Sequence, residues 1–121
     1  MAETNSNITM GNTKNPQKMD MHQAKHQSYS LAEITEKMHH EFDDEINGAN
    51  MYLDMAISAN DMHHEELAHW LSAMARDEFS HASFIHHHLK KSGVDLSESD
   101  HKMWKELEDR FHRVFSEEGT Y

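Results

Sequence analysis

The sequence predicts an all-α fold, in which a long antiparallel helix hairpin is followed by a shorter C-terminal helix. The composition supports this, because Glu, Met, Ala, Leu and Lys are common whereas β-branched residues, which favour sheets, are scarce. Apolar residues also recur at spacings of three, four and seven along three segments, which is typical of helices with one buried face. The 121 residues, of which 36% are hydrophobic, suffice for one modest domain.

The chain divides into three regions of different composition. Residues 1–28 are polar, aperiodic and poor in large apolar side chains, so we predict a disordered tail there. The periodic segments fall within residues 29–118, which are predicted to form a single helical domain. Residues 119–121 are predicted to be a short C-terminal tail.

The first predicted helix begins after Ser30 and ends near Asn60 or Asp61. Ser30 and Glu33 have the spacing of a capping box, in which each side chain accepts a hydrogen bond from the backbone of the other residue. Side chains with helical spacing are predicted to form its buried face: Leu31, Ile34, Met38, Phe42, Ala49, Tyr52, Ala56 and Ala59.

The second predicted helix begins by Glu65 or Glu66 and ends near Lys90 and Lys91, with Gly93 as the stop signal. Residues spaced alternately by four and three make a heptad-like seam along it: Leu67, Leu71, Met74, Glu78, His81, Ile85 and His88.

The third predicted helix begins at about Glu98, with Ser97 as its cap. It could cover its own hairpin or exchange with a second subunit, and the sequence does not choose. Its predicted apolar face contains Trp104, Leu107, Phe111, Val114 and Phe115. Together with Trp70, the large aromatic side chains are predicted to bury the outer seam of the hairpin, and Met38, Met55 and Met74 are predicted to fill its core.

Charge and cysteine content exclude several classes of function. The formal net charge of −11 makes phosphate-backbone binding unfavourable, so nucleic acid is not an expected partner. The absence of cysteine excludes disulfides, zinc–thiolate sites, iron–sulfur clusters and thiol catalysis. No apolar run is long enough to span a membrane, and the N-terminus lacks the apolar core of a secretory signal. We therefore expect a cytoplasmic protein.

Most of the thirteen histidines are expected to form a solvated, weakly metal-binding surface. The Glu-x-x-His spacing occurs four times, so these pairs have to be distinguished by their position relative to the apolar face of each helix. Only Glu78 and His81 both flank the apolar line of their helix. On the first helix, Glu45 lies at the centre of the apolar stripe and Glu41 near its edge.

Carboxylates placed on an apolar stripe need a partner, because a buried, unpaired charge is very unfavourable. Arg76 lies on the opposite side of its helix from Glu78 and is therefore not that partner. Glu45 and Glu78 could form hydrogen bonds at a wet interface with His81 and Tyr52. A metal ion is the more economical solution, and carboxylates with an imidazole suit iron, manganese or zinc.

The segment EINGANMYLDMA at residues 45–56 resembles the first metal-binding helix of rubrerythrin-type ferritin-like proteins. DEFSHA at residues 77–82 resembles the second helix of that family, and the resemblance covers residues 31–92. It implies a catalytic di-iron carboxylate site with Glu45, Glu78 and His81 as ligands. It also implies that Tyr52 is a hydrogen-bonding partner of these ligands and that Gly48 leaves room near the metals.

The chain departs from the family because it has one such helix pair, where a complete four-helix domain has two. Two copies would supply four Glu and two His, which is the ligand set of ferritin-like di-metal sites. We therefore predict a homodimer, or a larger homo-oligomer of dimers, that completes a ferritin-like four-helix bundle. The encapsulated ferritins are similar, which leaves an encapsulin shell open as a partner, although the C-terminus lacks an obvious shell-targeting tail.

The preferred functional hypothesis is a ferroxidase that oxidises Fe(II) with O2 or peroxide at this shared site, in iron storage or detoxification. Glu41 and Asp44 would guide ions toward it. The chain has no Cys-x-x-Cys rubredoxin module, so peroxidase turnover of the rubrerythrin type is not expected. Two alternatives stay open: a His- and Met-rich metal buffer or chaperone without redox catalysis, and a purely structural dimerisation module.

Overall fold

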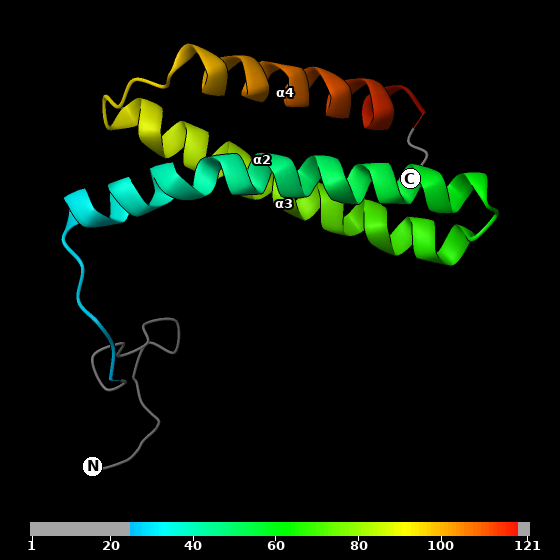
Figure 1. The fold of residues 1–121 in the computed structure, drawn as a ribbon, viewed down its shortest axis with the longest axis horizontal. Helices are drawn as coiled ribbons and strands as arrows, with labels where there is room; N and C mark the ends of the chain where they lie inside the picture. Colours follow the sequence, from blue (N-terminus) through cyan, green and yellow to red (C-terminus); the bar gives the residue numbers. More distant parts are fainter. Residues whose placement is uncertain (1–24, 119–121) are drawn as a thin grey trace, which may run out of the picture.

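The computed structural model describes residues 25–118 and contains three helices there: α2 (Leu31–Asp61), α3 (Glu65–Lys91) and α4 (Glu98–Glu118). The long helices α2 and α3 form an antiparallel hairpin, and α4 lies along one face of it (Figure 1). The predicted all-α fold is confirmed for this part of the chain. The predicted tails at residues 1–24 and 119–121 lie outside the described residues, and residues 25–28 have no regular structure.

Local capping signals determine where α2 begins and ends. The backbone N–H of Glu33 donates to Ser30 Oγ at 3.1 Å, and the backbone N–H of Ser30 donates to Glu33 Oε1 at 2.8 Å, which confirms the capping box. The short turn into α3 includes His63, whose positive φ of 65° reverses the chain. Its neighbour His64 donates its backbone N–H to the Ala59 carbonyl at 2.9 Å, which closes the end of the helix.

The connection from α3 to α4 follows the predicted signals as well. Gly93 has a φ of 75°, a left-handed conformation that glycine adopts without steric cost, immediately after the helix ends. The Val94 backbone N–H donates to the Leu89 carbonyl at 3.0 Å, as in a helix-terminating turn. Ser97 Oγ accepts a hydrogen bond from the Asp100 backbone N–H at 3.0 Å, so Ser97 is the cap predicted for α4.

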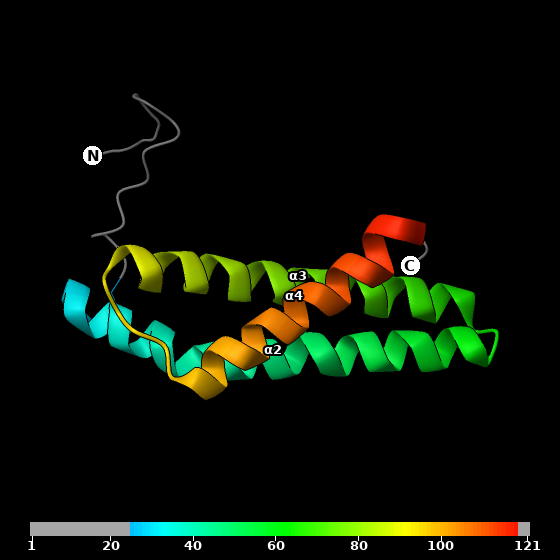
Figure 2. The same ribbon diagram turned by 90° about the horizontal axis from the view of Figure 1, so that it is seen from above.

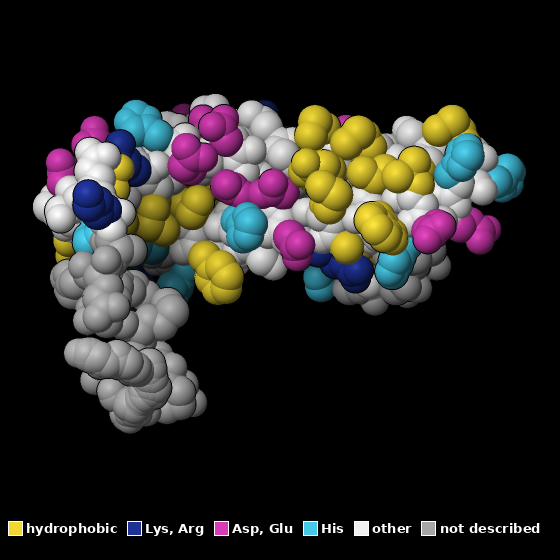
Figure 3. Space-filling model, turned by 90° about the horizontal axis from the view of Figure 1, so that it is seen from below, with side chains coloured by type: hydrophobic (Ala, Val, Ile, Leu, Met, Phe, Trp, Pro, Cys, Tyr) yellow, Lys and Arg dark blue, Asp and Glu magenta, His cyan; other side chains and the backbone are white. Residues whose placement is uncertain are grey.

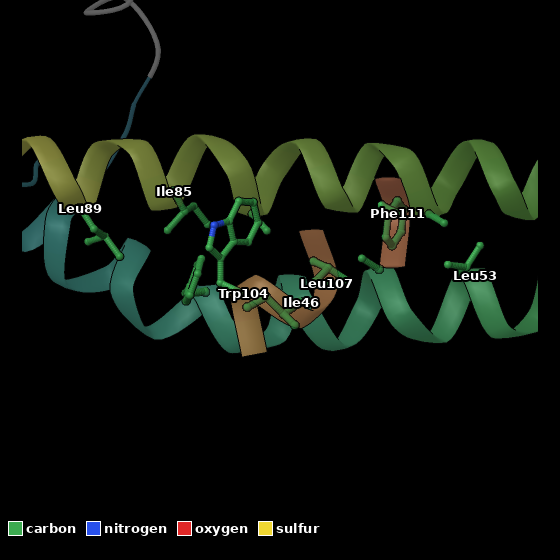
Figure 4. Close-up of a cluster of buried hydrophobic side chains, with 11 residues drawn as sticks. Ile46, Leu53, Ile85, Leu89, Trp104, Leu107 and Phe111 are labelled. Atoms are coloured by element: carbon green, nitrogen blue, oxygen red, sulfur yellow. The ribbon is translucent and has the colours of Figure 1, made fainter. Parts of the chain in front are cut away.

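The helix α4 covers its own hairpin, crossing it obliquely (Figure 2). The ring of Phe79 on α3 stacks on Trp104 at 5.6 Å and on Phe111 at 4.8 Å between ring centroids. Such aromatic stacking stabilises the contact beyond the area that it buries. Figure 4 shows the buried side chains that the three helices contribute to this core: Ile46, Leu53, Ile85, Leu89, Trp104, Leu107 and Phe111.

The predicted buried faces of α2 and α3 are partly wrong. Leu31 is 72% exposed and Trp70 is 65% exposed, whereas Ile46 and Leu53, which were not predicted as core residues, are buried. The reason is that α4 packs on the side of the hairpin to which Ile46 and Leu53 point, so the core is rotated away from the predicted stripe. The other apolar residues that were predicted to be buried but are exposed are Ile34, Met55, Leu67 and Met74.

The side of the hairpin opposite α4 is called the open face below. A band of exposed apolar side chains lies on it near the turn between α2 and α3, with carboxylate and imidazole groups toward the middle of the hairpin (Figure 3). The residues of this apolar band are Met55, Met62, Leu67, Trp70 and Met74. Within residues 25–118, no helix is both long and apolar enough to cross a membrane.

Candidate metal centre

The three predicted ligands meet on the open face. Glu45 of α2 and Glu78 and His81 of α3 each offer one ligand atom, and these atoms lie within 4.8 Å of one another. His81 Nδ1 is 3.1 Å from Glu45 Oε1 and 3.2 Å from Glu78 Oε1. Residues that are three or four positions apart lie on the same face of a helix, which explains why Glu78 and His81 point the same way. The antiparallel hairpin then brings Glu45 opposite them.

These side chains are less buried than the sequence predicted. The exposed fraction is 22% for Glu45, 28% for Glu78 and 57% for His81. The prediction placed them within a buried stripe, but α4 covers the other side of the hairpin. The group therefore lies at the surface of a single chain, where another molecule can reach it.

The electrostatics of the group show that it attracts positive charge. Burial, followed by contact with the Glu78 carboxylate, raises the pKa of Glu45. The hydrogen bond to Glu78 is the main reason that the pKa of His81 is raised, with a further contribution from Glu45. When the imidazole carries a proton on Nδ1, that proton lies between two carboxylates that would otherwise repel each other. A metal cation bound here would take over that role.

The geometry and the donor types fit a metal ion. For a divalent ion such as zinc, carboxylate oxygen and imidazole nitrogen ligands lie about 2.0–2.2 Å from the metal, so two ligand atoms are at most about 4.4 Å apart. The ligand atoms of the three residues lie within 4.8 Å of one another, which is close to that distance. Small side-chain rotations would bring them within about 4.4 Å. The set of two carboxylates and one imidazole is half of a ferritin-like di-metal set. The residues present therefore fit half of a di-iron site.

Gly48 lies next to the candidate ligands. A Cβ atom at this position would be 3.6 Å from both Cδ and Oε2 of Glu78, so the backbone of α2 passes directly beside that carboxylate. Glycine inside a helix is destabilising by roughly 0.5–1 kcal/mol relative to alanine. An alanine side chain at this position would be in ordinary van der Waals contact with the Glu78 carboxylate.

The remaining predicted site residues lie nearby but outside the group of three. Tyr52, seven residues after Glu45, is half-buried and packs against the core. Within the described part of the chain, its hydroxyl makes no hydrogen bond to the three candidate ligands. Glu41 and Asp44 are exposed on α2, one turn and one residue before Glu45.

Two histidines have structural contacts that the sequence pattern did not reveal. The ring of His86 stacks on Trp104 with 4.9 Å between centroids, and burial lowers the pKa of His86. His88 Nε2 lies 2.9 Å from Thr35 Oγ1, which connects the last turns of α3 to the first turns of α2. Only the placement of α4 and the pairing of the helices show these contacts, because neither follows from local spacing.

Comparison with known proteins gives one match. Residues 36–118 match the family model described as Rubrerythrin. This range covers more than half of the chain and includes most of α2 and all of α3, the helices that carry the candidate ligands. No curated protein and no solved structure matches the chain.

Proposed function

The chain belongs to the rubrerythrin family, and on this premise we propose that it is a di-iron ferroxidase that oxidises Fe(II) with O2 or peroxide. Proteins of this family are di-iron carboxylate proteins and typically bind iron. The observation that carries the proposal is the meeting of Glu45, Glu78 and His81 on one face of the hairpin. The proposal places this activity in iron storage or detoxification in the cytoplasm.

The site of this reaction is shared between two copies of the chain. One chain supplies two carboxylates and one imidazole, whereas a ferritin-like di-metal site uses four carboxylates and two imidazoles. A homodimer supplies the full set with no residue left over. The position of the group on the open face supports this arrangement, because α4 does not cover it.

Fe(II) is the substrate of the proposed reaction and Fe(III) is its product. Each Fe(II) loses one electron, so a bound pair supplies the two electrons that reduce O2 to hydrogen peroxide or hydrogen peroxide to water, with protons from solvent. Ligand atoms have to be deprotonated, so the raised pKa values of Glu45 and His81 mean that protons compete with Fe(II) for the site as the pH falls. The net charge of −11 attracts Fe(II), and the exposed Glu41 and Asp44 guide it along α2.

The alternative function is a metal buffer or chaperone without redox catalysis. It is supported by the thirteen histidines and ten methionines of the chain, several of which are exposed. A buffer distributes binding over many residues, so it would retain most of its capacity when Glu45 is lost. A ferroxidase would not.

The oxidation rate of substituted proteins tests the proposal. Metal-free protein is loaded with Fe(II) without oxygen and exposed to air, and the formation of Fe(III) is followed by near-ultraviolet absorbance. We expect rapid oxidation by the natural protein and oxidation no faster than in buffer for Glu45→Ala and His81→Ala. Glu36→Ala is the matched control, because Glu36 and His39 have the same Glu-x-x-His spacing away from the site. Rapid oxidation by both site variants would contradict the proposal.

A further inference from the structure

We propose that a groove between α2 and α4, on the side of the hairpin away from the candidate metal centre, binds a small ligand that carries a phosphate group. The groove has a volume of about 420 Å³ and lies where α4 crosses α2 obliquely (Figure 2). Pockets that hold small organic molecules have volumes of roughly 300–1,000 Å³, so its size is sufficient. None of the three candidate metal ligands lines this groove, so the proposal does not depend on the ferroxidase activity.

Side chains with N–H groups line both walls of the groove. Asn47 and Asn50 lie three residues apart on α2, and Arg110 and Arg113 lie three residues apart on α4. Residues at this spacing lie on the same face of a helix, which explains why each pair faces the groove. Two of the three arginines of the chain therefore meet in one groove, although the net charge of the chain is −11.

Arg110 is held in a fixed orientation by the protein. Its Nη1 donates a hydrogen bond to Oδ1 of Asn50 at 2.7 Å, and its Nη2 donates to the Asp54 carboxylate. A guanidinium group has further N–H groups, which are left for a ligand. Because Asn50 accepts through its oxygen, its amide N–H2 group is also left as a donor.

Arg113 and the side chain of Asn47 supply further donors. Among residues 25–115, whose side chains the structure describes, neither of these side chains has a hydrogen-bonding or ionic partner. The planar guanidinium of arginine binds phosphate through two parallel hydrogen bonds. A phosphate group has three oxygens that accept hydrogen bonds, so donors on both walls can bind it at once.

The carboxylates near the groove determine which end receives the phosphate. Glu106 is the one carboxylate among the described residues around the groove, and it precedes Arg113 by about 10 Å along α4. Asp54 lies near the other end, and its charge is paired with that of Arg110. The phosphate is therefore expected beside Arg110 and Arg113, away from Glu106.

The next carboxylates along the two helices are Asp43 and Asp109, one helical turn before Asn47 and Arg113. Neither lines the groove, and the Asp43 carboxylate contacts that of Asp100. Their charges weaken the attraction for an anion. Hydrogen bonds, rather than the overall charge, therefore have to hold the ligand.

Apolar residues form the rest of the groove. Ile46 and Leu107 are buried there, and Met103 is half-buried. Contact with these side chains would remove an apolar part of the ligand from water, which is favourable. An organic phosphate should therefore bind more tightly than inorganic phosphate.

Calorimetric titration of the full-length, metal-free protein tests the site, with phenyl phosphate and inorganic phosphate as probes at constant ionic strength. Metal-free protein is used so that iron does not bind the phosphate. We expect Arg113→Gln to weaken the binding of phenyl phosphate by about tenfold or more, because a hydrogen bond to a charged group is lost. Lys102→Gln is the matched control, since it removes one positive charge from an exposed position on α4 outside the groove. It should bind phenyl phosphate as the natural protein does.

Glu106→Gln gives a second test with the opposite sign. It removes a negative charge from the groove, so the binding of phenyl phosphate should become tighter. Tighter binding of phenyl phosphate than of inorganic phosphate would identify an organic phosphate as the ligand, and equal binding would identify inorganic phosphate. Either result supports the site.

Three results would overturn the proposal. The natural protein could bind neither probe, or Arg113→Gln could bind phenyl phosphate as tightly as the natural protein does. Benzoate, which carries a carboxylate in place of the phosphate, could bind as tightly as phenyl phosphate, which would remove the assignment to a phosphate.

Discussion

At the scale of single residues, the His81 imidazole lies between the carboxylates of Glu45 and Glu78. His81 Nδ1 lies within hydrogen-bonding distance of both carboxylates, and this nitrogen is the one directed at the site. The hydrogen bond to Glu78 raises the pKa of His81, and burial raises the pKa of Glu45. A cation therefore competes with protons for these groups, and the competition should strengthen as the pH falls.

The pH dependence of stability should report the protonated imidazole. The ordinary pKa of His81 is 6.5, and a raised value in the folded protein means that its stabilisation is fully present below pH 6.5. It is lost as the pH rises through the folded-state pKa. Because His81 is 57% exposed, we expect an effect below about 1 kcal/mol.

Urea unfolding of the metal-free natural protein and of His81→Ala checks this expectation. The free energy of unfolding of the natural protein should exceed that of the variant most clearly below pH 6.5, and the two should converge as the pH rises. An advantage of the natural protein that grows with pH would have the wrong sign.

Gly48→Ala should separate stability from metal binding. Alanine is the better helix former, so we expect the metal-free variant to gain roughly 0.5–1 kcal/mol of unfolding free energy. Its methyl group would contact the Glu78 carboxylate and restrict it, so Fe(II) oxidation should become slower. Thermal unfolding and oxidation rate are measured on the same preparations. Asn47→Ala, at an exposed neighbouring position on α2, is the control: it should become more stable without a change in oxidation rate. Unchanged oxidation by Gly48→Ala would contradict the role given to the glycine.

At the scale of helices, the two faces of the hairpin differ, because α4 packs on only one of them. On one face α4 is held by aromatic stacking and by Arg110, which donates hydrogen bonds to the Asn50 side chain at 2.7 Å and to Asp54. The open face carries the candidate ligands and the apolar band. The two tryptophans of the chain report on the two faces separately, since Trp104 is buried under α4 and Trp70 is exposed on the open face.

Substitution of the two tryptophans should therefore have different consequences. Trp104→Ala should lower the free energy of unfolding by about 3–5 kcal/mol, because a large buried side chain is removed. Trp70→Ala should change the stability of the single chain by no more than about 0.5 kcal/mol. It should instead weaken dimerisation, which sedimentation measures. A large loss of chain stability from Trp70→Ala, with dimerisation unchanged, would place Trp70 in the core of one chain.

The helix ends could be predicted from the sequence because their signals are local. The Ser30 and Glu33 capping box, Gly93 and the Ser97 cap all act within a few residues of the helix end that they define. The buried faces could not be predicted fully, because burial depends on where α4 lies. Ile46 and Leu53 are core residues only because α4 covers their side, and Trp70 is exposed because it points the other way.

The candidate site was predictable in part for a related reason. The register of Glu45, Glu78 and His81 relative to apolar residues identified them among many Glu and His residues, and the structure brings the three together. Their role as ligands stays a prediction. The sequence pattern treated the ligands and the core as one stripe, whereas the folded chain separates them onto neighbouring faces.

At the scale of the whole molecule, the main feature is the open face, which α4 does not cover. The open face combines half of a ligand set with exposed apolar side chains at both ends of the hairpin. A second copy would complete the ligands and cover the apolar groups in the same step. Binding of Fe(II) and dimerisation should therefore be linked, so that each strengthens the other.

An anaerobic Fe(II) titration of the metal-free protein, with sedimentation velocity on the same samples, tests the shared site most directly. We expect binding to saturate at about two Fe(II) per dimer, as for a ferritin-like di-metal site. The dimer should become the dominant species as saturation is approached. Gradual binding of many ions, or tight binding by chains that sediment as monomers, would contradict a site shared between two copies.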